Sequence, residues 1–354
     1  MTAEPVVRFK DVDIVFGNDP SSALPLIDRG DSRETIQEET GQVLGVSGAT
    51  LDVMEGEIIV LMGLSGSGKS TLLRAVNGLN PVIRGQTLVD DGNGYIDPQR
   101  CSPRDLRRLR THRVAMVFQQ FGLLPWRTVA DNVGFGLELA GLPAATRRER
   151  VREQLELVGL SQWADRKVNE LSGGMQQRVG LARAFATGAP ILLMDEPFSA
   201  LDPLIRNRLQ DELLQLQSQL RKTIIFVSHD LDEAFRIGNR IAIMEGGRIV
   251  QCGTPQEIVQ RPANRYVADF VANMNPLAML VASDIMVSGK PAADQVGDGF
   301  SATAKPDTPL TDILDTIARR PGAVGVVNNG AIIGTITAQD VVKGLTRHRS
   351  SATE

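Results

Sequence analysis

Short runs of apolar residues, separated by longer amphipathic stretches, mark much of this chain. Three runs are continuous, as in strands that are buried on both faces of a sheet: EIIVLMG (57–63), ILLM (191–194) and TIIFVS (223–228). Helical patterns separate them, which is typical of crossover connections between parallel strands. The pattern therefore predicts an α/β fold with a mainly parallel sheet.

Two segments precede the first buried run. Residues 6–16 alternate between apolar and polar side chains, which predicts an edge strand. Residues 18–48 are polar and rich in turn-forming residues. Within them, Asp31 and Glu34 have the spacing of a capping box, so we expect a short helix over 32–39 that a nearby glycine ends.

A helical insertion interrupts the α/β alternation at about residues 120–170. Its clearest segment is TRRERVREQLELVGL (146–160). There Val151, Leu155 and Val158 follow one another at spacings of four and three residues, which places them on one face of a helix.

The end of the chain has a different composition. Residues 240–252 form two apolar runs around a pair of glycines, which indicates a β-hairpin. After Pro276 small residues, aspartate and proline become frequent, and a compact αβ pattern follows. We therefore place a domain boundary there, with one domain over 1–275 and a second over 277–349.

Composition excludes several classes of protein. The chain has 354 residues, of which 42% are apolar and 23% charged, as in ordinary globular proteins. With 42 acidic against 38 basic residues, it offers no electrostatic case for a nucleic-acid partner. Cys101 and Cys252 lack the spacing of metal ligands and are expected to be reduced thiols. Without a signal sequence or a run of about 18 apolar residues, we expect the chain neither to cross a membrane nor to be exported.

A glycine-rich loop, GLSGSGKST, follows the first buried run and precedes a predicted helix. Backbone N–H groups of such a loop close around phosphate oxygens, while Lys69 reaches the β and γ phosphates and Ser70 binds Mg²⁺. A flexible glycine turn is the alternative, which the strand–loop–helix context disfavours. The predicted ligands are ATP and Mg²⁺. The predicted phosphate-binding residues are Gly63, Leu64, Ser65, Gly66, Ser67, Gly68, Lys69, Ser70 and Thr71.

Four polar residues stand at the carboxyl ends of predicted strands, where α/β proteins bind ligands. Asp195 is expected to hold Mg²⁺, and Glu196 to polarise the attacking water as a general base. His229 ends the third buried run, near the expected γ-phosphate. Gln119 follows VAMVF (114–118) and is expected to touch both Mg²⁺ and the water. Taken singly, each residue has an ordinary alternative as a solvated or structural polar group.

The sequence LSGGMQQ (171–177) is the most specific motif. Ser172 has the chemistry to cap the helix that follows, and Gly173 and Gly174 leave its N-terminus bare, so that its N–H groups can meet an anion. Capping alone explains the serine but not the two glycines.

Phe16 ends the first predicted strand and precedes a glycine. A flat aromatic ring there can stack on adenine without reading its edges. Packing in the core is an equally simple explanation.

Taken in their order along the chain, these motifs resemble the nucleotide-binding domain of ABC transporters, over about residues 6–275. The matched elements are the A-loop aromatic at Phe16, Walker A at Gly63–Thr71, the Q-loop at Gln119, the signature at Leu171–Gln177, Walker B at Asp195 and Glu196, the D-loop at Ser199–Asp202 and the switch histidine at His229. The resemblance implies a P-loop NTPase fold and ATP hydrolysis. It also implies a head-to-tail homodimer in which Ser172, Gly173 and Gly174 contact the ATP of the other copy.

Four longer stretches are similar to the ATPases of importers for quaternary amines, namely choline, glycine betaine and proline betaine: LMGLSGSGKSTLLRAVNGLNP, FQQFGLLPWRTV, MDEPFSALDPLIR and FVSHDLDEAFRIGNRIAIM. Residues 18–48 resemble the choline-type branch. The resemblance implies transmembrane permease subunits, an indirect periplasmic solute-binding partner and a peripheral place on the cytoplasmic face of a bacterial inner membrane. Alternatives are an ABC ATPase for an amino acid or another osmolyte, a soluble ABC ATPase of DNA repair or translation, and a sensor that binds ATP without hydrolysis.

Residues 277–349 resemble one copy of a CBS domain. The resemblance rests on AVGVVNN (323–329), AIIGTIT (331–337) and a closing motif that runs to Asp340. Because such modules normally act in pairs, we expect pairing across the homodimer and a regulatory role. Thr337 and Asp340 are the candidate ribose contacts, ionic strength is an alternative input, and a folded appendage that aids dimerisation is the plainer alternative.

Overall fold

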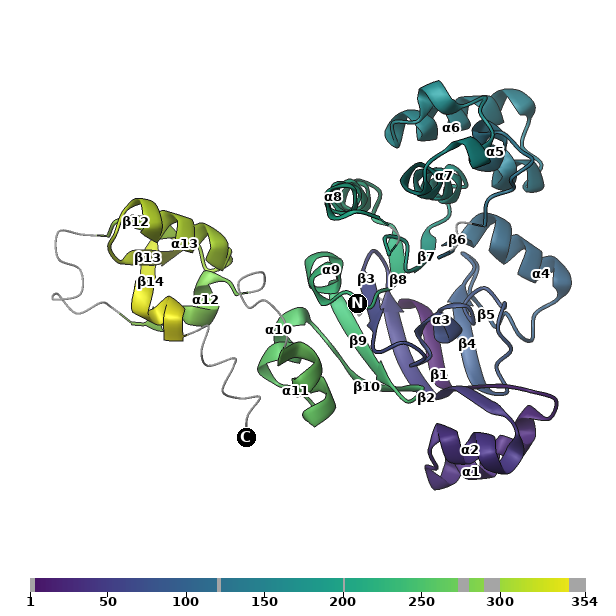
Figure 1. Cartoon of the computed structure of the whole chain (residues 1–354), viewed down its shortest axis with the longest axis horizontal. Helices are drawn as coiled ribbons and strands as arrows, with labels where there is room; N and C mark the ends of the chain where they lie inside the picture. The colour runs from purple at the N-terminus through teal and green to yellow at the C-terminus, as the bar shows by residue number, and fades with distance from the viewer. Residues whose placement is uncertain (1–3, 120–121, 200, 273–279, 290–299, 344–354) are drawn as a thin grey trace. The chain divides into compact units, whose positions relative to one another are not determined.

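The computed structural model describes residues 4–119, 122–199, 201–272, 280–289 and 300–343 (Figure 1). The chain divides into two compact units, one of residues 1–229 with 237–252 and one of residues 230–236 with 253–354. The predicted boundary near residue 276 lies outside the described residues and stays a prediction.

A six-stranded sheet with the strand order β10-β9-β3-β8-β7-β6 forms the centre of the first unit. Its strands are β3 (Ile58–Met62), β6 (Val114–Val117), β7 (Ile191–Asp195), β8 (Thr223–Val227), β9 (Arg240–Glu245) and β10 (Arg248–Gly253). β3 is parallel to β8 and β9, and β7 is parallel to β6 and β8. Every residue of β3, β7 and β8 is buried, so the predicted parallel core is confirmed.

A second, antiparallel sheet has the order β2-β1-β4-β5. Its strands are β1 (Pro5–Phe16), β2 (Val43–Met54), β4 (Arg84–Asp90) and β5 (Tyr95–Ile96). The prediction that residues 6–16 form an edge strand is wrong, because β1 pairs with β2 on one side and with β4 on the other. Alternation reports that one face of a strand is buried, but it carries no information on the number of neighbouring strands. Phe9 of β1, Leu61 of β3 and Leu72 of α3 (Lys69–Leu73) share one core with both sheets.

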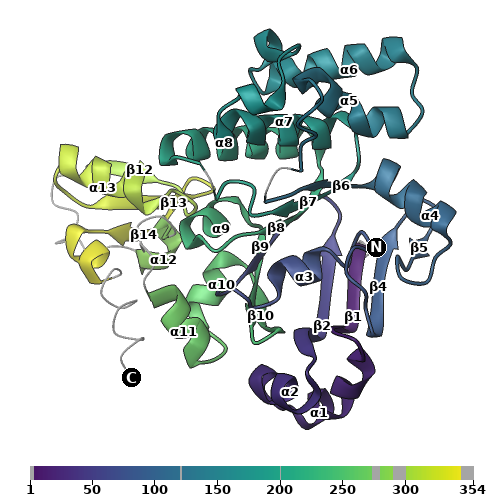
Figure 2. The same ribbon diagram turned by 45° about the vertical axis from the view of Figure 1, so that its right-hand side comes forward.

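Two short helices, α1 (Leu24–Arg29) and α2 (Arg33–Thr40), follow the 3₁₀ turn Pro20–Ala23 and lie beside β1 and β2 in both views (Figures 1 and 2). Their apolar side chains pack on Val15 and Leu44: these are Ala23, Leu26, Ile27 and Ile36. α2 confirms the predicted helix, and Gly41 ends it in a left-handed conformation with φ 70°. The predicted cap is wrong. Ser32 Oγ accepts from the Thr35 amide, whereas Asp31 accepts from Arg29.

The predicted helical insertion is present. α5 (Val129–Leu139) and α6 (Ala144–Leu157) pack with α7 (Gly173–Ala186), and the three lie together in both views (Figures 1 and 2). Their shared core contains Val151, Leu155 and Val158, as the helical spacing predicted. The other helical segments of this unit are α4 (Pro103–Arg108), the π-helical turn Leu109–Arg113, the 3₁₀ turns Ser161–Trp163 and Val168–Glu170, and α8 (Pro203–Leu220).

The second unit contains a four-stranded sheet of order β11-β14-β13-β12. The strands are β11 (Val287–Ser288), β12 (Ala302–Ala304), β13 (Val324–Asn328) and β14 (Ala331–Ile336). α12 (Ala282–Ile285) and α13 (Leu310–Arg319) contribute to its core with Val324, Val326 and Ile336. The helices α9 (Leu231–Ile237), α10 (Pro255–Gln260) and α11 (Arg265–Ala272) complete the described elements, most of their residues belonging to this unit.

Candidate functional site

The loop between β3 and α3 is made of glycines in backbone conformations that other residues avoid. Gly63, Gly66 and Gly68 have φ angles of 141°, 80° and 99°. A Cβ atom on Gly63 would lie 2.1 Å from the carbonyl oxygen of Met244, and one on Gly68 would lie 2.4 Å from that of Gly45. The loop therefore packs directly on the backbones of β9 and β2, which only glycine permits.

Lys69 and Ser67 bring polar side chains into this loop. Lys69 is only 5% exposed, and its Nζ donates to the carbonyl oxygens of Gly63 and Leu64 at 2.8 and 2.9 Å. Burial lowers the pKa of the Lys69 ammonium, while the carboxylates of Glu196 and Asp195 act in the opposite direction. The hydroxyl of Ser67 is buried, and no residue in the described parts of the chain bonds to it. A buried cation and a spare hydroxyl in a glycine loop suit an anionic ligand.

Asp195 is a fully buried carboxylate with two partners from α3 and its C-terminal cap. Ser70 Oγ donates to its Oδ1 at 2.5 Å. Arg74 donates to its Oδ2 from Nη2 at 2.8 Å and from Nε at 3.2 Å. Arg74 was not among the predicted site residues, although its position four residues after Ser70 is the spacing that brings side chains to one helix face. A hydroxyl and a carboxylate are oxygen ligands of the kind that Mg²⁺ takes.

Glu196 lies between the other two predicted catalytic residues. Its Oε2 is 3.1 Å from His229 Nδ1 and accepts from Gln119 Nε2 at 3.3 Å. The three residues follow β7, β8 and β6, so adjacent parallel strands deliver them to one edge of the sheet. Glu196 has φ 46° in the left-handed region, and its amide donates to the Val227 carbonyl at 3.1 Å. The proximity predicted for these residues is present, except that Gln119 bonds to Glu196 and not to the Asp195–Ser70 pair.

Phe16 lies over the strand that faces the phosphate loop. Its side chain is 36% exposed, which argues against the alternative that it is a core residue. A Cβ on Gly45 would lie 2.9 Å from a ring carbon of Phe16 and 2.9 Å from Cγ2 of Thr71. The exposed ring of Phe16 is thus separated from Thr71 of the phosphate loop by Gly45 alone, on the path that this Cβ would bridge.

The N-terminus of α7 is open, as the glycine pair predicted. Ser172 Oγ accepts from the Met175 amide at 3.4 Å. Ser172 and Gly173 are exposed, and a Cβ on Gly173 would meet no atom within 4 Å. In the adjoining D-loop segment, Ser199 Oγ donates to the carbonyl of Glu196 at 3.0 Å, while Ala200 lies outside the described residues.

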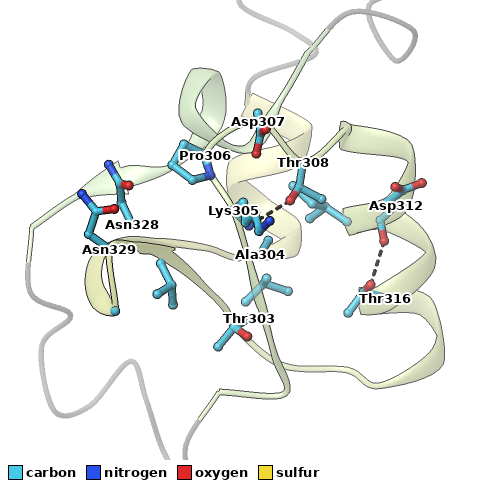
Figure 3. Close-up of a pocket in the computed structure, with 14 residues that line it drawn as sticks. Thr303, Ala304, Lys305, Pro306, Asp307, Thr308, Asp312, Thr316, Asn328 and Asn329 are labelled. Carbon is cyan, nitrogen blue, oxygen red and sulfur yellow. Dashed lines mark hydrogen bonds between the residues drawn. The ribbon is translucent and has the colours of Figure 1, made fainter.

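The second unit has its own concavity of about 850 Å³ (Figure 3). It is lined by the turn Thr303–Thr308, by α13 and by the β13–β14 turn. The candidate ribose contacts Thr337 and Asp340 are not part of this lining. Instead Thr337 Oγ1 donates to Asp340 Oδ2 at 2.6 Å, where the chain enters the helical segment 338–343. The two residues therefore cap a helix, as in a capping box.

Known proteins resemble this chain over nearly its whole length. The ATP-binding protein TmoW of the trimethylamine N-oxide transport system of Ruegeria pomeroyi is 44% identical over 336 residues, which cover 95% of each chain. This chain belongs to the family of ABC transporter ATP-binding proteins. The ABC transporter sequence profile matches residues 46–199, and the CBS domain profile matches residues 282–347. Both predicted resemblances are confirmed.

Two further members of the family support this assignment. The ATP-binding protein ProV of the glycine betaine/proline betaine transport system of Salmonella typhimurium is 53% identical over 271 residues, or 77% of this chain and 67% of ProV. The dimeric bacterial ABC transporter cassette MJ0796 superposes with a TM-score of 0.60 at 30% identity, covering 70% of this chain and 98% of the cassette. The chain is thus an ABC-type ATPase. Within its described parts, no helix combines the length and the apolar character needed to cross a membrane.

Proposed function

We propose that this chain is the ATP-hydrolysing subunit of an ABC importer for choline or betaine-like quaternary amines. The ATPase part of this proposal rests on the position of Glu196. Its side chain is hydrogen-bonded to Gln119 and His229, and it directly follows Asp195, which is bonded to Ser70. The solute is proposed from the relatives, because transport ATPases do not form the solute pathway. ProV serves glycine betaine and proline betaine, and it is 53% identical to this chain.

In this proposal ATP binds along the glycine loop. Its phosphates accept from the loop amides and from Lys69, and its adenine stacks on Phe16. Ser70 and Asp195 hold Mg²⁺, with Gln119 as a further oxygen ligand. The bound ion neutralises part of the phosphate charge. Lys69 supplies positive charge inside the loop, where low solvent exposure strengthens its field.

Glu196 is the proposed general base. It accepts a proton from the water that attacks the γ phosphorus, while the bond from that phosphorus to the bridging oxygen of ADP breaks. Hydrogen bonds from Gln119 and His229 hold the carboxylate in one orientation. Since phosphoryl transfer depends mainly on positioning and electrostatics, three strand ends that converge on one carboxylate suit the reaction.

The proposed assembly is a head-to-tail homodimer. The open N-terminus of α7, with Ser172, Gly173 and Gly174, then contacts the ATP bound by the other copy. The cassette MJ0796 is dimeric, which supports the pairing of two copies. The helical layer of α5 and α6 engages transmembrane permease subunits, so that the chain is peripheral on the cytoplasmic face of the inner membrane. A periplasmic solute-binding protein acts on it only through the permease.

The tail is proposed to pair with its counterpart in that homodimer. Val287 and Ile332 are 53% and 40% exposed. Both belong to the four-stranded sheet, where Val287 of β11 pairs with Thr335 and Ile332 of β14 pairs with Val327, so the sheet carries exposed apolar side chains. A second copy would cover these apolar side chains, which a single αβ layer leaves exposed.

A second candidate solute is trimethylamine N-oxide. TmoW, which serves that solute, aligns over 95% of both chains, the tail included. Trimethylamine N-oxide and glycine betaine share a trimethylated nitrogen, so solute-binding proteins can recognise both through the same type of contact.

Hydrolysis is tested with the variant Glu196→Gln, which keeps the side-chain shape and removes the base. We expect it to bind MgATP, to lose about two to four orders of magnitude in turnover and to accumulate as a nucleotide-bound dimer in size-exclusion chromatography. Glu153→Gln, at an exposed position of α6, is the matched control with normal turnover. Normal turnover in Glu196→Gln would place the base elsewhere.

The solute is tested in cells that lack this gene. Uptake of labelled choline, glycine betaine and trimethylamine N-oxide is measured after complementation with the wild-type chain or with Glu196→Gln. We expect only the wild type to restore uptake of at least one of them. If the deletion leaves all three unchanged and no second system compensates, the solute class is wrong while the ATPase assignment stands.

A further inference from the structure

The guanidinium of Arg33, the first residue of α2, enters a cage of four glycines beside the phosphate loop. Its Nη1 donates to the carbonyl of Gly66, and its Nη2 donates to the carbonyl of Gly45. A Cβ on Gly247 would lie 3.1 Å from Nη2, and one on Gly68 would lie 3.5 Å from it. Glycines of the phosphate loop, of β2 and of the β9–β10 turn therefore make the space that this side chain fills.

This guanidinium is a half-buried cation that forms no ion pair within the described residues. Its Nε is buried and has no hydrogen-bond partner, and no carboxylate of the described residues forms an ion pair with it. Burial lowers the pKa of Arg33, and only the neighbouring Glu34 opposes that effect. Because arginine stays protonated in proteins, two carbonyl dipoles hold a full positive charge at this place. Such a charge is stabilised further when an anion binds nearby.

The two acceptors of Arg33 belong to two different elements of the proposed nucleotide site. Gly66 belongs to the phosphate loop. Gly45 lies under the ring of Phe16 and beside Thr71. Because a peptide unit is planar, holding the Gly66 carbonyl also sets the direction of the next amide in the loop. By bonding to both carbonyls, Arg33 fixes the orientation of the Gly66 peptide relative to β2, the strand next to the Phe16 ring.

We propose that Arg33 is a positioning residue for ATP, which locks the phosphate loop to β2 and adds a fixed positive charge beside the phosphates. The helix pair α1–α2 then acts as a brace for the nucleotide site. This inference rests on the proposed function, in which ATP occupies the loop Gly63–Thr71.

The test compares Arg33→Gln with the wild-type chain in steady-state hydrolysis and in fluorescent-nucleotide titrations. We expect the KM and the nucleotide Kd to rise about tenfold, as the loss of a charged hydrogen-bond donor implies, while kcat changes less than twofold because Glu196 and its partners are untouched. Arg33→Lys keeps the charge but lacks the planar fork, so its KM should fall between the two. Arg29→Gln is the matched control, since Arg29 is an exposed residue of α1 that pairs with Asp31 and Glu39.

Lys69→Ala separates this inference from the function on which it rests. If that variant binds nucleotide normally, the loop is not the ATP site and the proposed function is wrong. If Lys69→Ala loses nucleotide while Arg33→Gln keeps a wild-type KM, Arg33 is not a positioning residue. An Arg33→Gln chain that melts earlier but binds nucleotide normally would show a purely structural role. Should this variant not fold, a wild-type KM in Arg33→Lys would overturn the inference.

Discussion

Burial and a strained backbone conformation occur together at the residues of the nucleotide site. Glu196 adopts a positive φ angle that non-glycine residues rarely occupy. Asp195 is completely buried, and Lys69 nearly so. Strain and burial of this kind cost stability and persist where the surrounding fold determines them. At each of these positions the cost comes with an orientation that the proposed chemistry requires.

Lys69 should make the stability of the nucleotide-free chain depend on pH. Its pKa in the folded chain is lower than the ordinary value, so between these two values the unfolded chain binds more protons. The free energy of unfolding should therefore rise with pH across this window, up to the ordinary lysine value of about 10.4. The measurement is urea unfolding from about pH 8 upward, for the wild type and for Lys69→Met, which keeps an apolar stem of similar length.

The informative quantity is the difference in unfolding free energy between these two chains, because Lys222 has a pKa lowered by burial as well and contributes equally to both. We expect this difference to increase with pH in favour of the wild type. A difference that stays constant would show that the Lys69 ammonium is not destabilised by burial.

The residues of the site were predictable from the sequence to different degrees. Glu196, Gln119 and His229 stand at strand ends, so a parallel sheet brings them together whatever the details of packing. Arg33 is different. It lies far from the loop in sequence, and although the helix that carries it was predicted, its role depends on the exact place where α2 meets the loop. No local signal encodes that meeting point.

At the scale of elements, the helix pair α1–α2 is held to the antiparallel sheet by a small core of its own. Ile36 is fully buried in this core and lies one helical turn after Arg33. The same docking that buries the apolar face therefore directs the guanidinium to the phosphate loop.

Ile36→Ala should weaken this docking by about 2–4 kcal/mol, because it removes buried methyl groups and leaves a cavity. We expect faster hydrogen exchange of the amides in α1 and α2, together with a higher KM for ATP because Arg33 loses its support. Glu38→Ala, at an exposed position of the same helix, should change neither. Unchanged exchange in Ile36→Ala would mean that other contacts hold the helix pair.

Most elements of the fold could be predicted, and the errors share one cause. The buried runs at β3, β7 and β8 and the stripe of Val151, Leu155 and Val158 follow from local patterns of burial. The edge assignment of β1 and the capping role of Asp31 failed because each depends on a choice between partners. Two neighbours can flank a strand that looks half-buried, and Ser32 competes with Asp31 for one amide. Local sequence does not rank such competitors.

At the scale of the whole molecule, we expect the CBS domain, matched at residues 282–347, to regulate the ATPase. Truncation after Pro276 should leave basal ATPase activity intact, because every proposed catalytic residue precedes that position. The response of this activity to ionic strength or to cytosolic nucleotides should disappear, since the pairing tails are the proposed input. The measurement is phosphate release by both chains over a salt series, with and without added nucleotides.

Two outcomes would contradict this prediction in different ways. A truncated chain without any hydrolysis would show that the tail is structural. A truncated chain that keeps every response would show that the tail does not regulate.

The bonds of Arg74 to Asp195 also bear on how the molecule takes up its metal. One oxygen of the carboxylate already faces a guanidinium, so the pair is nearly neutral and offers a free divalent ion little attraction. Magnesium is reluctant to shed its water and is usually held by one or two carboxylates together with substrate phosphates. On the proposed function, the order of loading is then set by electrostatics. This site would take up magnesium only together with the nucleotide, so a cell rich in magnesium but depleted of ATP would leave the subunit empty.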